Sequence, residues 1–156
     1  AEIISAGKGA SLSVNHEGTD INNDSTVLKL SYGDASFLFT GDAENEVNEA
    51  MIVNTSDNFD VDIDVLKVSH HGRDDATNSA LLSALTPTVG IISTRNNGLL
   101  HQNVVELLTD SQTDVFRIDL PSPNDNRQNP DQQTTPSDLI ISTDGKTIIV
   151  EYAEPM

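Results

Sequence analysis

Residues 35–51 read ASFLFTGDAENEVNEAM, and the spacing of their apolar side chains changes from that of a strand to that of a helix. The first part, residues 35–40, is a short apolar run that predicts a strand. From Ala43 onward, apolar residues recur three or four positions apart, which predicts a helix. Asp42 therefore lies at a strand-to-helix junction, where layered α/β proteins collect side chains for chemistry.

The rest of the chain repeats this unit of a strand followed by a helix. Such alternation predicts an α/β fold in which helices pack on a sheet. We expect a single domain over residues 1–156 and a flexible loop at about residues 121–136, where Pro, Asn, Asp and Gln replace any hydrophobic period. The further predicted strands are 26–31, 63–68, 89–93 and 115–118, the further helices are 80–85 and 104–108, and a terminal hairpin covers 139–150.

The composition limits the chemistry. The chain has 156 residues and no cysteine, so any metal must be held by His, Asp or Glu. No apolar run approaches the roughly 20 residues needed to cross a bilayer, and the start lacks the layout of a signal peptide. The chain begins at Ala1 without Met, which is compatible with the removal of a leader or an upstream domain.

The charge is strongly acidic. Asp and Glu outnumber Lys and Arg by 25 to 8, which gives a formal net charge of -17. Such a surface repels nucleic acid at long range, so a phosphate substrate would require bound cations or a local group of donors. An acidic surface of this kind keeps a protein soluble. Acidic surfaces are also common in proteins from halophilic organisms, so a halophilic source is a second explanation.

Histidines gather where two further predicted strands end. His70 and His71 follow strand 63–68, and His101 follows strand 89–93 in a loop that also contains Asn97. A neutral imidazole is a good ligand for zinc or manganese. Taken one at a time, each of these residues has an explanation without function. The histidines fit structural or surface positions, Asn97 fits a turn, and Asp42 fits the cap of a helix. Together, three strand-end clusters in one small domain predict a metal-dependent hydrolase.

The order of these clusters resembles the metallo-β-lactamase-fold domain of ComEC-type competence proteins. The matching segments lie between residues 22 and 101. They are NDSTVLKL at 23–30, GDAE at 41–44 with Glu49, DVLKVSHHG at 64–72, and an Ile-Ile-Ser strand that leads into Asn97 and His101. The resemblance implies the carboxyl-terminal half of a four-layer αββα metallo-β-lactamase sandwich.

The resemblance also implies roles for individual residues. Asp42 would bridge two divalent metals, zinc or manganese, and His70 would be the late metal-binding histidine. His71 would be a second site residue near the metals or a bound phosphate, and the sequence leaves open which of the two rings is the ligand. His101 and Asn97 would contact the substrate or donate a proton.

The chain departs from the family pattern in three places. Gln102 follows His101 where relatives commonly have Pro, and Arg73 follows the His-His-Gly run where they usually have Ser. The family's His-x-His-x-Asp-His cluster is absent before Asp42, where the only histidine is His16, which we expect on the surface. An upstream half or a second chain, or self-association into a homo-oligomer, is therefore expected to complete the site and to cover the sheet.

The expected function of the complete protein is two-metal hydrolysis of a phosphodiester, with DNA as a candidate substrate. This chain alone would be inactive and would bind metal weakly or not at all. One alternative is a non-catalytic binding or assembly module, and another is a hydrolase of thioesters, lactams or phosphorylcholine esters. The resemblance favours an extracytoplasmic location.

Overall fold

The structure, a computed structural model, describes residues 2–5, 21–54, 62–94, 100–119 and 138–153. Its main sheet has the strand order β1-β2-β3-β4-β5-β6. Neighbours from β1 to β3 pair antiparallel, and neighbours from β3 to β6 pair parallel. The strands are β1 (Glu2–Ser5), β2 (Val27–Tyr32), β3 (Ala35–Phe39), β4 (Val65–Lys67), β5 (Val89–Ile92) and β6 (Asp114–Arg117). This sheet, with its connecting helices, confirms the predicted α/β class.

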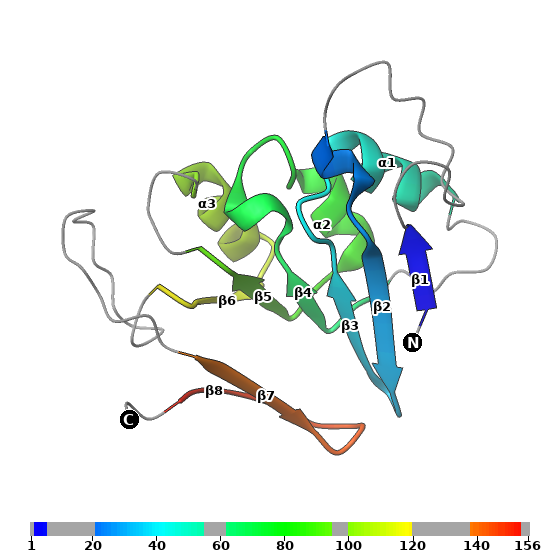
Figure 1. The fold of residues 1–156 in the computed structure, drawn as a ribbon. Coiled ribbons are helices and arrows are strands. Elements are labelled where there is room, and N and C mark those ends of the chain that lie inside the picture. The colour runs from blue at the N-terminus through cyan, green and yellow to red at the C-terminus, as the bar shows by residue number, and fades with distance from the viewer. Residues whose placement is uncertain (1, 6–20, 55–61, 95–99, 120–137, 154–156) are drawn as a thin grey trace.

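The α-helices lie on one side of the sheet (Figure 1). They are α1 (Asn45–Asn54), α2 (Ser79–Leu85) and α3 (Gln102–Asp110), and the 3₁₀ helices are η1 (Ile21–Asp24) and η3 (Ser69–Gly72). Each α-helix connects two neighbouring parallel strands, as the sequence predicts. Within the described ranges, no helix has the length and apolar character to cross a bilayer.

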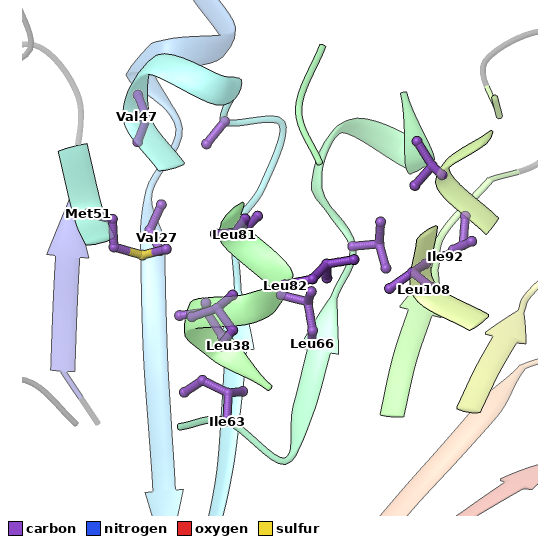
Figure 2. Packing of buried hydrophobic residues seen from close by; sticks show 14 residues of the cluster. Val27, Leu38, Val47, Met51, Ile63, Leu66, Leu81, Leu82, Ile92 and Leu108 are labelled. Atoms are coloured by element: carbon purple, nitrogen blue, oxygen red, sulfur yellow. The ribbon is translucent and has the colours of Figure 1, made fainter. Parts of the chain in front are cut away.

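The main core fills the space between these helices and the sheet. Val47 and Met51 of α1 and Leu81 and Leu82 of α2 are buried there. Figure 2 shows the α2 leucines close to strand residues such as Leu66. Because apolar residues on these helices recur at the helical period, each helix buries one face against the sheet.

A hairpin lies on the opposite side of the sheet (Figure 1). It consists of β7 (Leu139–Thr143) and β8 (Ile148–Tyr152), and its apolar residues pack against Phe37 and Val65. The Asp34 amide donates a 2.6 Å hydrogen bond to the Gly145 carbonyl. This bond fixes the hairpin turn to the turn between β2 and β3.

Part of this second sheet face is not covered by described residues. Leu30, Tyr32 and Phe39 are 39%, 60% and 41% exposed. The strand register places Leu30 opposite Phe37 and Tyr32 opposite Ala35, on the face that carries the hairpin. An apolar surface of this kind fits the prediction that a further layer packs on the sheet, and the four-layer sandwich stays a prediction.

Most predicted elements are found within a few residues of their expected bounds. The strand β1 was not predicted, because a four-residue strand carries little periodic signal and depends on its partner β2. Residues 121–136, predicted as a flexible loop, lie outside the described part of the chain, as do His16 and Asn97.

Candidate metal centre

The candidate site lies at the edge of the sheet where parallel strands β3, β4 and β5 end. Asp42 follows β3, and His70 and His71 lie in η3, which follows β4. The carboxyl ends of parallel strands meet along one edge, which is the usual ligand site of open α/β sheets. The structure thus places Asp42 and the two histidines after neighbouring parallel strands, and their roles as site residues stay predictions.

The His71 ring faces Asp42. Its Nε2 atom lies 3.6 Å from Asp42 Oδ1, and its Nδ1 atom is hydrogen-bonded to the carbonyl oxygen of Ser93. Since a carbonyl only accepts, Nδ1 carries the proton, and in the neutral ring Nε2 keeps its lone pair. A carbonyl that orients an imidazole in this way is the usual support for a metal-binding histidine.

The His70 ring points to different partners. Its Nδ1 atom lies 3.2 Å from Asp75 Oδ1 and 3.6 Å from Glu44 Oε1. The centroids of the His70 and His71 rings are 6.3 Å apart. The sequence left open which ring faces the cation position beside Asp42, and the geometry favours His71. A metal-ligand role for His70 beside Asp42 stays a prediction.

The backbone of η3 separates the two rings. His70 and His71 have φ values of 45° and 58°, and Gly72 follows at 82°. Left-handed backbone costs about 1–2 kcal/mol for a residue with a Cβ atom, and such strain concentrates at functional sites. In this left-handed turn the two adjacent rings have different partners, Asp75 for His70 and Asp42 for His71.

Lys67 places a cation beside Asp42. Its Nζ atom lies 3.8 Å from Asp42 Oδ1 and donates a 2.6 Å hydrogen bond to the Gly41 carbonyl. Burial lowers the pKa of Lys67, while the Asp42 carboxylate opposes this shift. Lys67 thus holds the loop after β3 in place. The carboxylate of Asp42 contacts Lys67 and His71, which does not support a role as a simple helix cap.

His101 lies next to this site without contacting Asp42. Its Nδ1 atom is 2.9 Å from Asp74 Oδ1, and its backbone amide donates to the Gly72 carbonyl. The hydrogen bond from His101 lowers the pKa of Asp74, which keeps that carboxylate ionised. Arg73 donates from Nε to Asp75. This contact engages part of the Arg73 guanidinium with a neighbouring acid.

Asp42 and His71 fit a divalent cation. Tetrahedral zinc with ligand bonds of about 2.0–2.2 Å has ligand atoms about 3.4 Å apart, close to the 3.6 Å between Asp42 Oδ1 and His71 Nε2. A carboxylate oxygen and a neutral imidazole suit zinc or manganese. Further ligands would have to come from outside this pair, as the resemblance implies.

Comparison with known proteins gives two relatives. ComE operon protein 3 of Bacillus subtilis is 38% identical over 101 residues, which cover 63% of this chain and 13% of that protein. Recombination protein 2 of Haemophilus influenzae is 43% identical over 72 residues, which cover 46% of this chain and 8% of that protein. These relatives support a relationship to competence proteins. No protein-family model matches the chain.

The matched part is a small share of each relative, about an eighth or less of its length.

Sequence reasoning missed Glu44, Asp75 and Ser93 as neighbours of the histidines. Two signals in the sequence point to further site residues: Glu44 belongs to the GDAE motif, and Lys67 is a charged residue within an apolar strand.

Proposed function

We propose that this chain is the carboxyl-terminal half of a metal-dependent phosphodiesterase of the metallo-β-lactamase superfamily, which hydrolyses DNA during its uptake. The observation that carries the proposal is the pairing of Asp42 Oδ1 with His71 Nε2 at 3.6 Å, with Ser93 fixing the ring from behind. The similarity to ComE operon protein 3 supports the link to competence.

The chain's own residues divide the work. Asp42 and His71 would hold the cations, and a divalent cation supplies Lewis acidity and lowers the pKa of water. Lys67 positions the loop that carries Asp42 through the Gly41 carbonyl. The ionised Asp74 holds Nδ1 of His101. In the proposed reaction, Nε2 of His101 would donate a proton to the leaving oxygen. Asn97 would orient the substrate.

The charge of the chain supports a role for cations. With a net charge of -17, the protein repels a polyanion at long range. Cations at the strand edge would offset this repulsion at the place where the phosphate must bind. The site loops carry few basic groups of their own, and Lys67 and Arg73 are both engaged with carbonyl or carboxylate oxygens.

The direct test is turnover of bis-para-nitrophenyl phosphate by the intact protein, including the expected upstream half, with manganese or zinc. Asp42→Asn and His71→Ala should each lower kcat/KM strongly. The loss should exceed the roughly 10- to 100-fold that is typical when a residue hydrogen-bonded to a metal ligand is replaced. Glu46→Gln, which removes an exposed acid at the start of α1, is the matched control and should leave kcat/KM within about twofold.

Unchanged turnover in both variants would contradict the proposed roles. Absence of any metal-dependent turnover in a folded wild-type protein would favour the binding or assembly module instead.

A further inference from the structure

We propose that Glu44, His70 and Asp75 form a second divalent-cation site, separate from the pair Asp42 and His71. Glu44 immediately precedes α1, His70 lies in η3, and Asp75 lies in the turn after η3. The three side chains each offer one ligand atom, and these atoms lie within 4.8 Å of one another. The hydrolysis proposed above assigns its cations to Asp42 and His71, and the present proposal is an alternative to the role beside Asp42 that the resemblance implies for His70.

The distances between the ligand atoms fit a metal. His70 Nδ1 lies 3.2 Å from Asp75 Oδ1 and 3.6 Å from Glu44 Oε1. These values lie on either side of the ligand separation of about 3.4 Å expected for tetrahedral zinc. A cation could therefore contact all three atoms after only small side-chain movements.

The burial of two of the ligand atoms is a second, independent observation in favour of a metal site. Within the described part of the chain, His70 Nδ1 and Asp75 Oδ1 are buried atoms that make no hydrogen bond, although they lie 3.2 Å apart. Leaving buried polar atoms without partners is costly. A cation between them would satisfy both atoms at once, because each has a lone pair to offer when the ring is neutral and the acid ionised.

Hydrogen bonds from neighbouring side chains orient Asp75 and Glu44 as ligands. Arg73 Nε donates a 2.9 Å hydrogen bond to Asp75 Oδ2, the oxygen that faces away from His70. Asn22 Nδ2 donates a 3.0 Å hydrogen bond to Glu44 Oε1, the same oxygen that lies near His70, and so holds that atom in place. Metal-binding carboxylates are commonly held in this way by outer hydrogen bonds.

The donor set indicates the class of ion. One imidazole nitrogen and two carboxylate oxygens suit zinc or manganese better than calcium or magnesium, which prefer oxygen ligands throughout. The Asn45 amide already donates to the Asp75 carbonyl, so the loop before α1 and the turn after η3 lie in contact. A bound ion would cross-link these segments and stabilise the strained turn that carries His71.

The competing account is a protonated His70 that forms ion pairs with both acids and binds no metal. Zinc content after equilibrium dialysis of the intact protein distinguishes the two accounts. Glu44→Gln and Asp75→Asn keep the size of each side chain, and each should lose one zinc equivalent per chain relative to wild type. Glu46→Gln, which removes the same charge two residues along, should lose none.

Cobalt substitution supplies a second readout. The visible absorption of the bound cobalt should lose one component in His70→Ala, and that component should remain in Asp42→Asn and His71→Ala. Wild-type zinc content in folded Glu44→Gln and Asp75→Asn, with far-UV circular dichroism as the check of folding, would overturn the proposal. If only Asp42→Asn lost metal while Glu44→Gln and Asp75→Asn kept it, the second site would be overturned. The proposed hydrolase would stay intact in that case.

Discussion

At the scale of single residues, the direction of the two imidazoles depends on three consecutive residues with positive φ. His70 and His71 are strained in this conformation, and Gly72 at 82° is the one member of the three that adopts it without a steric penalty. The turn also receives the His101 amide at the Gly72 carbonyl. Gly72 therefore connects the histidine pair to the loop that carries His101.

Replacing Gly72 with Ala should lower the free energy of unfolding by about 1–3 kcal/mol. The new Cβ atom would be strained by the positive φ and would lie 2.6 Å from Leu100 Cδ1. Gly90→Ala is the matched control, since Gly90 has no positive φ and a Cβ atom added there would come no closer than 3.1 Å to its neighbours. Urea unfolding measures both. An equal or smaller loss for Gly72→Ala would contradict the importance of this turn.

At the scale of elements, the position of the hairpin depends on its turn. Asp144 Oδ1 accepts hydrogen bonds of 2.9 Å from the amides of Lys146 and Thr147. These bonds lower the pKa of Asp144 below its usual value of 3.8. An acid whose pKa is lowered by folding stabilises the fold above its unfolded pKa and loses this contribution as the pH falls through the folded pKa.

The variant Asp144→Asn should test this dependence, because Asn accepts the same hydrogen bonds and does not titrate. The Tm of wild type should exceed that of Asp144→Asn at about pH 6, and the difference should shrink as the pH falls from about 4 to about 2. Thermal unfolding monitored by circular dichroism provides the measurement. A difference that stays constant over this range would show that the Asp144 carboxylate does not stabilise the turn.

Most of the elements could be predicted because their signals are local. The strand β3 and the helix α1 follow from the change of hydrophobic period around Asp42, and the hairpin follows from its Asp144-Gly145 turn. The neighbours of His70 could not be predicted. Glu44 and Asp75 meet this ring only because β3 and β4 pair in parallel and the histidine turn is left-handed. A hydrophobic pattern contains neither piece of information.

At the scale of the whole molecule, the sheet presents one covered and one partly exposed face. Helices cover the first face, and among the described segments the hairpin covers the part of the second face near Phe37 and Val65. In the described part of the chain, Leu30, Tyr32 and Phe39 leave apolar surface exposed on the second face. In the proposed hydrolase, a second sheet from an upstream half would bury this surface and would bring further metal ligands to the same edge.

Reactivity of the two tyrosines should test this arrangement. Tyr32 is 60% exposed, whereas the hydroxyl of Tyr152 is hydrogen-bonded to the backbone of Arg117 and burial raises its pKa. In the dilute 156-residue chain, Tyr32 should be modified faster than Tyr152 by hydroxyl radicals. In the protein with its upstream half, Tyr32 should become the slower of the two. Unchanged reactivity of Tyr32 would show that nothing covers this face.

The central claim is that Asp42 and His71 bind the same cation. Anomalous diffraction at the zinc edge, from crystals of the intact protein grown with zinc, tests it most directly. We predict a peak about 2.0–2.2 Å from both a carboxylate oxygen of Asp42 and Nε2 of His71. Zinc bound elsewhere in a catalytically active crystal, with neither Asp42 nor His71 among its ligands, would contradict the claim.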